Sequence, residues 1–211
     1  MPKRLLLFVP VLLLVLLAGC RNAPVALAGV GRLAVLTPEN YTDCPEIAAE
    51  IKNELLARLP GRIAAEVIDG APFEAGMLPT PAEVVMGARA ADLGRQYGID
   101  AFILGEVTAY DESHREHLRL AFGSESDFSA DFKVDLAVDL AFNLRLVRAA
   151  DGATLIYRQA AESATEVFSF GLGRPYISFT VSVQPLYPQL RREAARNAVR
   201  DLLRKLARES V

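Results

Sequence analysis

The stretch Phe132-Lys-Val-Asp-Leu-Ala-Val-Asp-Leu-Ala-Phe-Asn-Leu-Arg-Leu-Val147 decides the fold of this chain of 211 residues. Every second residue from Phe132 to Leu146 is apolar, and the residues between them are polar or small. A β-strand places alternate side chains on opposite faces, whereas a helix would scatter these apolar residues around its surface. The pattern therefore predicts a strand with one face in the core. It would extend about 50 Å, so we expect it to bend or to overhang its sheet.

The segments next to this stretch predict its partners in a mixed sheet. A turn signal at 149–152 leads into a β-favouring run at 153–161, which indicates an antiparallel hairpin. Upstream, short apolar runs at 33–36, 63–68 and 101–109 alternate with helical patterns. The order βαβαβ implies parallel pairing with right-handed crossovers.

Three helices are predicted to pack on this sheet and complete an α/β fold. They cover 45–59, with proline at the first turn, 81–97, which opens with the capping box Thr80-Pro-Ala-Glu83 and closes at Gly98, and 188–208 at the C-terminus. The last helix carries an apolar stripe formed by Leu190, Ala194, Ala198, Leu202 and Leu206.

The N-terminus reads as an export signal. Lys3 and Arg4 precede an apolar run over 5–18, which is too short to span a membrane as a helix. The run ends in Leu17-Ala-Gly-Cys20, which resembles the bacterial lipobox, so we expect cleavage of residues 1–19 and lipid on Cys20. The alternative is an uncleaved core segment of a cytosolic protein. Because residue 21 is Arg, the periplasmic face of the outer membrane is the expected location if the source is Gram-negative.

The mature chain is predicted to have two parts. Residues 20–31 would form the lipid anchor and a tether of at most about 36 Å. Residues 32–211 would form a single domain with inserts at 111–130 and 165–187.

Charge and cysteine content exclude some classes of protein. Removal of residues 1–19 takes away Lys3 and Arg4, which leaves 21 basic against 26 acidic residues and a formal charge of −5. That balance argues against binding of nucleic acid. With Cys20 lipidated, Cys44 has no intrachain partner, and we expect it to be buried; a bridge between chains is the alternative.

No enzyme signature or cofactor motif is present, and neither a catalytic residue nor a small-molecule substrate is predicted. His114 and His117 suggest a metal site, but nothing completes a zinc set, and a solvated loop is the favoured interpretation. Asp131, Asp135 and Asp139 share a strand face at spacings of about 13 Å, too far apart for a carboxylate pair of the glycosidase type.

Two features are candidate contact surfaces. Residues 167–183 form an amphipathic hairpin pattern, whose apolar face would meet a membrane or another subunit and comprises Phe168, Phe170, Leu172, Ile177, Phe179, Val181 and Val183. A basic face on the last helix comprises Arg192, Arg196, Arg200 and Arg204; it would meet lipid headgroups or an acidic partner, or be simply solvated.

Three stretches resemble one family. They are Arg32-Leu-Ala-Val-Leu-Thr-Pro-Glu-Asn-Tyr-Thr42, Gly98-Ile-Asp-Ala-Phe-Ile-Leu-Gly-Glu-Val107, and the hairpin from Arg145-Leu-Val147 to Asp151-Gly152. In order and spacing they are similar to bacterial lipoproteins that share the domain of the curli secretion channel (CsgG), of LpoB-like activators of penicillin-binding proteins, and of the N-terminal part of the Tol β-propeller protein (TolB). The resemblance implies a non-enzymatic envelope protein.

Two functions are consistent with these observations. The first is a lipid-anchored accessory or assembly factor that binds a protein partner in export, appendage or cell-wall machinery. The second is an oligomeric outer-membrane channel of the curli type, built from hairpins that cross the membrane. The arms at 167–183 are short for a crossing, which needs about 9 to 11 residues per strand. The insert at 111–130 could supply a second hairpin, with Leu118, Leu120 and Phe122 against the start of the long strand.

Overall fold

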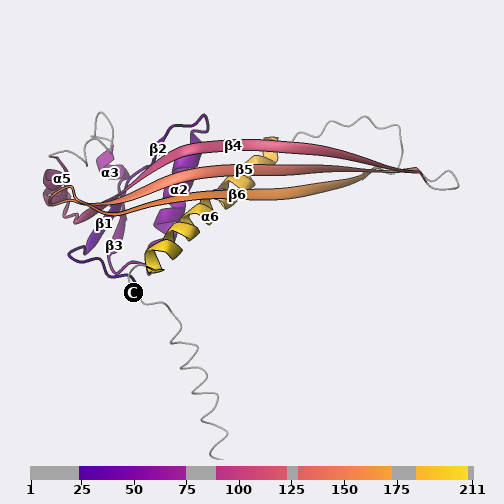
Figure 1. The fold of residues 1–211 in the computed structure, drawn as a ribbon. Coiled ribbons are helices and arrows are strands. Elements are labelled where there is room, and N and C mark those ends of the chain that lie inside the picture. Colours follow the sequence, from indigo (N-terminus) through magenta and orange to yellow (C-terminus); the bar gives the residue numbers. More distant parts are fainter. Residues whose placement is uncertain (1–23, 75–88, 123–127, 173–183, 209–211) are drawn as a thin grey trace, which may run out of the picture.

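A mixed sheet of six strands organises the protein, as the computed structural model shows for residues 24–74, 89–122, 128–172 and 184–208 (Figure 1). The strand order is β3-β1-β4-β5-β6, and β2 pairs with β4 off this path. β1 is parallel to both of its neighbours, whereas β4, β5 and β6 form an antiparallel meander. This confirms the predicted α/β class. The strands are β1 (Arg32–Val35), β2 (Glu39–Asn40), β3 (Glu66–Asp69), β4 (Ala101–Phe122), β5 (Phe128–Arg148) and β6 (Thr154–Leu172).

The helices agree with the prediction at both ends of the chain. They are α2 (Glu46–Arg58), α3 (Ala71–Glu74), α5 (Ala90–Tyr97) and α6 (Tyr187–Arg208), with a 3-10 turn, η1, at Gln184–Leu186. Of the helix expected over 81–97, the described part is α5, and the proposed capping box at 80–83 lies outside the described residues. α5 ends at Gly98 with a φ of 64°, the left-handed conformation expected of a glycine that closes a helix.

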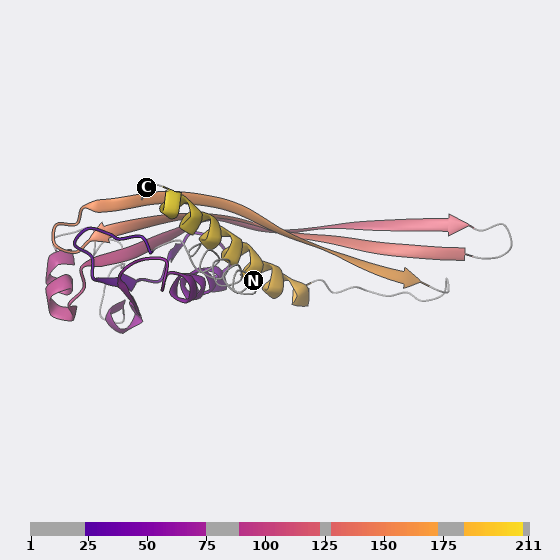
Figure 2. The same ribbon diagram turned by 90° about the horizontal axis from the view of Figure 1, so that it is seen from below.

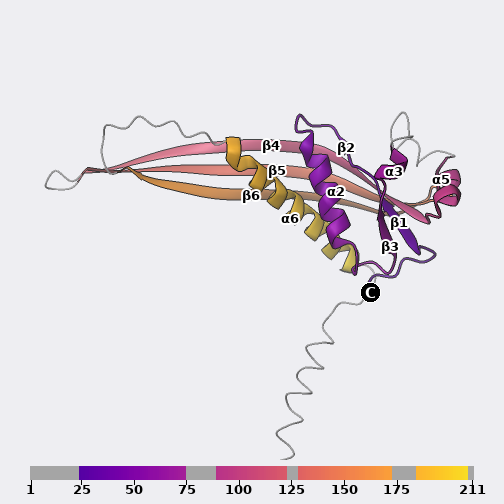
Figure 3. The ribbon, with the colours of Figure 1, turned by 180° about the vertical axis from the view of Figure 1, so that it is seen from behind.

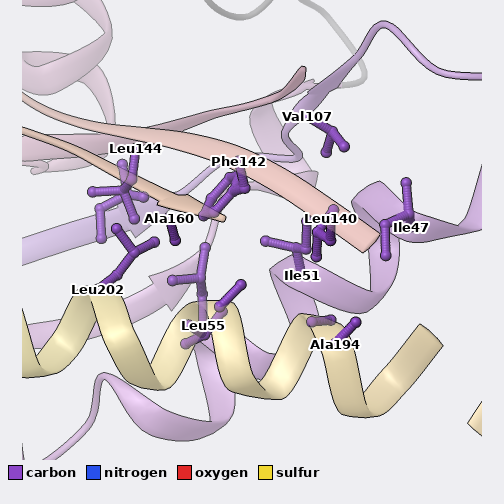
Figure 4. Packing of buried hydrophobic residues seen from close by; sticks show 14 of the residues in the cluster. Ile47, Ile51, Leu55, Val107, Leu140, Phe142, Leu144, Ala160, Ala194 and Leu202 are labelled. Atoms are coloured by element: carbon purple, nitrogen blue, oxygen red, sulfur yellow. The ribbon is translucent and has the colours of Figure 1, made fainter. Parts of the chain in front are cut away.

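The sheet has a core on each face near its parallel strands. α2 and α6 lie side by side on one face (Figure 3), where Ile47, Ile51, Leu55 and the stripe of α6 meet the apolar face of β5 (Figure 4). The alternation in the long strand is confirmed, because Val134, Leu136, Val138, Leu140, Phe142, Leu144 and Leu146 are all buried. A smaller cluster around Phe102 packs the other face against α5.

The insert expected at 111–130 is largely strand instead. β4 continues without a break to Phe122 and pairs with β5 over its whole length, apart from a bulge between Val107 and Ala109. The favoured interpretation of this insert as a solvated loop was therefore wrong. The alternative pairing is confirmed, with Leu118 opposite Phe132 and Phe122 opposite Phe128.

The expected tether is also partly folded. The backbone of Val25 bonds to both sides of the turn after α2, through its N–H to the carbonyl of Arg62 and through its carbonyl to the N–H of Ala64. Val30 is buried in the main core, and Leu27 packs against it. Residues 24–31 thus belong to the domain, because their apolar side chains cover the open end of the core.

Candidate functional site

The candidate site is the part of the sheet that extends away from the helices. We call residues 109–122 of β4, 128–141 of β5 and 161–172 of β6 the β-arm. Figures 1 and 2 show these three strands running on, with a marked twist, past the region that α2 and α6 cover. Within the β-arm, each strand is longer than the roughly five or six residues of a common strand. The β-arm is therefore an extended three-stranded sheet and not a short hairpin.

Both long edges of the β-arm lack a neighbouring strand among the described residues. β2 last pairs with β4 at Val107, where the N–H of Tyr41 also bonds the Val107 carbonyl. From Ala109 onward the described pairing of β4 is with β5 alone, and the described pairing of β6 is with β5 alone. Such edges present backbone N–H and C=O groups that can bind an added strand.

The two faces of the β-arm differ in character. Val134, Leu136 and Val138 of β5 are fully buried on the face that continues the core. On the opposite face the register places Arg115, Asp135 and Val167 in one row across the three strands, and Val167 is 59% exposed. His117 lies 3.0 Å from Asp135 on this face. The outer face is therefore polar and of mixed charge, with one large apolar side chain in contact with water.

An open groove of about 860 Å³ lies at the base of the β-arm, where the edge of β4 becomes free. Its walls are the loop from Tyr41 to Glu46, the bulged segment from Thr108 to Glu112, and the start of α6 at Tyr187, Pro188 and Arg191. Four carboxylates line it, from Asp43, Glu46, Asp111 and Glu112.

Arg191 fixes the inner wall of the groove. Its side chain is only 14% exposed; Nε lies 3.1 Å from Oε1 of Glu50, and Nη1 donates to Sγ of Cys44 at 3.2 Å. Burial raises the pKa of Glu50, and the charge of Arg191 opposes that rise. Cys44 is free and buried, as expected. Cys44 thus packs under the start of α2 and contacts Arg191.

The phenol of Tyr110 stays protonated at every physiological pH. Burial, together with its hydrogen bond to Glu112, raises the pKa of Tyr110 far above the ordinary range. The same carboxylate and Asp111 add to the effect of burial in raising the pKa of Tyr187. No histidine stands among the described residues that line the groove, and the ionisable groups beside Tyr110 and Cys44 are the carboxylates of Glu112 and Glu46. The groove is lined by hydroxyl and carboxylate groups together with the Arg191 side chain.

Asn40 and Thr42 of the family-like motif shape the groove loop. The amide of Asn40 donates from Nδ2 to the Cys44 carbonyl, and its Oδ1 accepts from the N–H and the hydroxyl of Thr42. These local bonds replace ladder bonds and turn the chain from β2 into α2. The motif is thus a structural device that positions Tyr41 and Asp43.

The predicted contact hairpin at 167–183 is described only in its first half. Residues 167–172 continue β6 and pair with β5, where Phe168 is opposite Val134 and Phe170 opposite Phe132. Phe168 is partly buried against the main core. Ile177, Phe179, Val181 and Val183 lie outside the described residues, as does Cys20.

The predicted basic face of α6 is exposed at Arg192, Arg196, Arg200 and Arg204. Arg196 approaches Glu54 of α2 at 3.7 Å, and Lys205 pairs with Asp201 one helical turn away at 2.6 Å. His114 and His117 both lie on β4. Across the described ranges, no three His, Cys, Asp or Glu side chains cluster in a way that could hold a metal.

One buried cation could not be found from sequence. Lys52 of α2 is 7% exposed, and its Nζ lies 2.8 Å from Asp69, 3.2 Å from Glu74 and 3.0 Å from the Thr37 hydroxyl. It joins α2 to the segment that follows β3.

None of the helices in the described ranges is both long and apolar enough to cross a membrane.

No family model and no curated protein matches the chain. Several solved structures are similar to it in fold. Lipoprotein GNA1162 from Neisseria meningitidis is 18% identical with a TM-score of 0.44, over 64% of this chain and 83% of that one. A Helicobacter pylori protein described as a homologue of the neuraminyllactose-binding hemagglutinin is 11% identical with a TM-score of 0.49, over 90% of both chains. The C-terminal domain of LpoB from Salmonella enterica is 10% identical with a TM-score of 0.37, over 64% and 84%. At these identities and scores, the likenesses do not assign a function.

Proposed function

We propose that the protein is a lipid-anchored accessory factor of the bacterial envelope that binds a protein partner through the β-arm. The observation that carries this is the β-arm itself: three paired strands that extend past the helices with both described edges unpaired. Cys20 would hold the domain at a membrane, and no catalytic step is required of it.

The edge of β4 is the favoured contact within the β-arm. It begins beside the groove, so a strand added next to Ala109–His117 would place side chains against Tyr110, Glu112 and the loop at Tyr41. Backbone hydrogen bonds along the edge would supply affinity, and the groove would supply selectivity. The four carboxylates of the groove favour basic side chains on such a strand.

The test is photo-crosslinking in cells of the source organism. A photoreactive amino acid replaces Ser113, which is exposed on the edge of β4, and the matched control replaces Ala153, which is exposed on the turn between β5 and β6 far from the β-arm. We expect a discrete adduct with another envelope protein at position 113 and none at 153. Equal labelling at both positions, or no adduct at 113, would refute the proposal.

Val167 offers a second test that does not depend on the edge. Because its side chain is 59% exposed, Val167→Asp should leave stability within about 0.5 kcal/mol of the parent. Capture of the partner found by crosslinking should nevertheless weaken, since the only large apolar group exposed on the described outer face of the β-arm becomes charged. Ala153→Asp is the matched control, and we expect it to bind as the parent does.

A second candidate function is self-assembly into a channel. It is favoured by one observation, the length of the β-arm strands, because β4, β5 and β6 each exceed the roughly 9 to 11 residues that a membrane crossing needs, although the second arm of the 167–183 hairpin lies outside the described residues. Two free edges at opposite sides of one sheet would also suit a ring of identical subunits. Crosslinks from position 113 would then join two copies of this chain, and the purified protein would conduct ions in planar bilayers. A monomer in detergent that gives no conductance would exclude this function.

A further inference from the structure

The docked N-terminal segment fixes which end of the domain faces the membrane. Val25 is held in the turn after α2 by two backbone hydrogen bonds, with Arg62 and Ala64. Between Cys20 and Val25 the sequence has only four residues, which span at most about 18 Å when fully extended. A lipidated Cys20 would therefore keep this turn within about 18 Å of the membrane surface.

The C-terminal half of α6 lies at the same end. Arg191 pairs with Glu46 and Glu50, and Arg196 with Glu54, so the two helices run parallel with their N-termini together at the groove. α6 continues for twelve residues beyond Arg196, whereas α2 ends at Arg58. α6 therefore reaches past the C-terminal end of α2, from which the turn at 60–63 follows.

The charges at this end have the sign that anionic lipid attracts. Arg62, Arg200 and Arg204 are exposed there, and none of the described ion pairs includes them. Arg21 adds a further positive charge in the link to Cys20. At the opposite end of the same two helices the groove carries Asp43, Glu46, Asp111 and Glu112. The domain is thus polarised, basic where the anchor arrives and acidic at the groove.

We propose that Arg62, Arg200 and Arg204 rest on the anionic headgroups of the membrane that holds Cys20, and so set the orientation of the domain. This rests on the lipidation assumed in the proposed function and deepens it. The anchor joins the domain at Val25, whose bridge to Ile63 follows the C-terminal end of α2, whereas the groove lies at the N-terminal ends of α2 and α6. The free edge of β4 and the groove would then face away from the bilayer, where a partner can reach them.

The experiment measures the distance of two positions from the lipid surface in the full-length lipidated protein. Ala64→Cys lies at the proposed membrane end and Ala109→Cys at the groove; both sites are exposed, and the native Cys44 is buried. Each variant is labelled with a fluorophore and reconstituted into vesicles whose headgroups carry a quencher. One set of vesicles is phosphatidylcholine alone, and the other contains phosphatidylglycerol as well. The parent protein, without an added cysteine, reports background labelling.

We expect strong quenching at position 64 and weak quenching at 109 in vesicles with phosphatidylglycerol, and a smaller difference in phosphatidylcholine or at high salt. Replacement of Arg62, Arg200 and Arg204 by Gln should lower the ratio of anchored molecules that rest on the bilayer in this orientation to those that do not, by about fivefold for each arginine. The control with the same change in net charge replaces Arg95, Arg115 and Arg148, which lie elsewhere on the surface, and it should leave the difference unchanged.

Equal quenching at both positions would overturn the inference, as would a difference that survives both the triple substitution and the loss of anionic lipid. Protein that fails to float with any vesicle would show that Cys20 carries no lipid, which would overturn the inference together with the membrane anchor. If position 113 still crosslinks to its partner while positions 64 and 109 are quenched alike, only the orientation is wrong and the proposed function stands.

Discussion

Gly105 of β4 gives the sharpest test of how the core is packed. A methyl group at this position would lie 2.6 Å from Cε2 of Phe142 and 2.9 Å from Cβ of Pro38. Ordinary carbon contacts are about 3.5 to 4.0 Å, and Phe142 is fully buried at the centre of the main core (Figure 4). The ring would have to move into space that other side chains occupy. Overpacking of this kind costs about 1 to 3 kcal/mol.

An opposing effect comes from the unfolded chain. Alanine has less freedom there than glycine, which favours folding by about 0.4 to 1 kcal/mol. We therefore expect Gly105→Ala to lower the free energy of unfolding by about 1 to 2 kcal/mol. With a urea slope of about 2 kcal/mol per molar, the midpoint should fall by roughly 0.5 to 1 M.

Urea unfolding followed by circular dichroism measures this shift, with Gly31→Ala as the control. The nearest atom to a methyl group at Gly31 is Oδ2 of Asp100 at 3.4 Å, an ordinary contact, so its midpoint should stay close to the parent. Phe142→Leu removes the ring atom that clashes, and in the double variant Gly105→Ala should cost less than it does alone. If Gly105→Ala and Gly31→Ala unfold at the same urea concentration, the packing argument is wrong.

Three further predictions concern other parts of the chain. Val138→Asp places a charge at a fully buried position and should destabilise the fold by about 3 kcal/mol or more; a melting temperature close to that of the parent would contradict the assignment of the faces. Lys52→Met leaves the carboxylate of Glu74, 16% exposed, without its cation, and should cost about 2 to 4 kcal/mol in thermal unfolding. Addition of Glu74→Gln should recover much of that loss, and the absence of any recovery would argue against a coupled pair. Cys20→Ser should abolish lipid attachment, which mass spectrometry of the mature N-terminus detects; an unmodified N-terminus in the parent protein would refute lipidation.

The sheet was predictable wherever the two faces of a strand have different surroundings. β5 alternates because one face packs on α2 and α6 while most of the other meets water, and the alternation identified its buried residues from Val134 to Leu146. It did not identify Val147, which is buried in the smaller cluster on the other face. The parallel unit was found from short apolar runs because β1 is covered on both faces: Leu33 and Val35 belong to one core cluster and Ala34 to the other.

The β-arm was missed on β4 for the same physical reason. Residues 113–117 are exposed on both faces of the strand. Their side chains therefore do not alternate between apolar and polar, and the sequence shows no strand pattern there. Their strand conformation comes from the backbone pairing with β5, which is a tertiary effect. The extent of β6 was underestimated because Glu162 and Glu166 interrupt its apolar pattern.

Lys52 and Arg191 show a further limit of sequence reasoning. Lys52 follows Ile51 on an amphipathic helix, and its neighbours in sequence do not indicate that it is buried. Its partners Asp69 and Glu74 are distant in sequence and reach it only in the folded chain. Arg191 stands one residue before the basic face of α6 and looks like part of it, yet it turns inward to Glu50 and Cys44. Burial of a charge depends on partners that only the folded chain brings together.

The position of β1 has a consequence for how the chain folds. β1 is made before either of the strands that flank it, and both of them follow only after long intervening segments. β4, β5 and β6 pair with immediate neighbours, so loop closure favours their association first. We expect β1 to be inserted late, with Leu33, Ala34 and Val35 open to aggregation until then. Pulse-labelling hydrogen exchange during refolding should therefore show the amides of β5 protected before those of β1, and simultaneous protection would contradict this order.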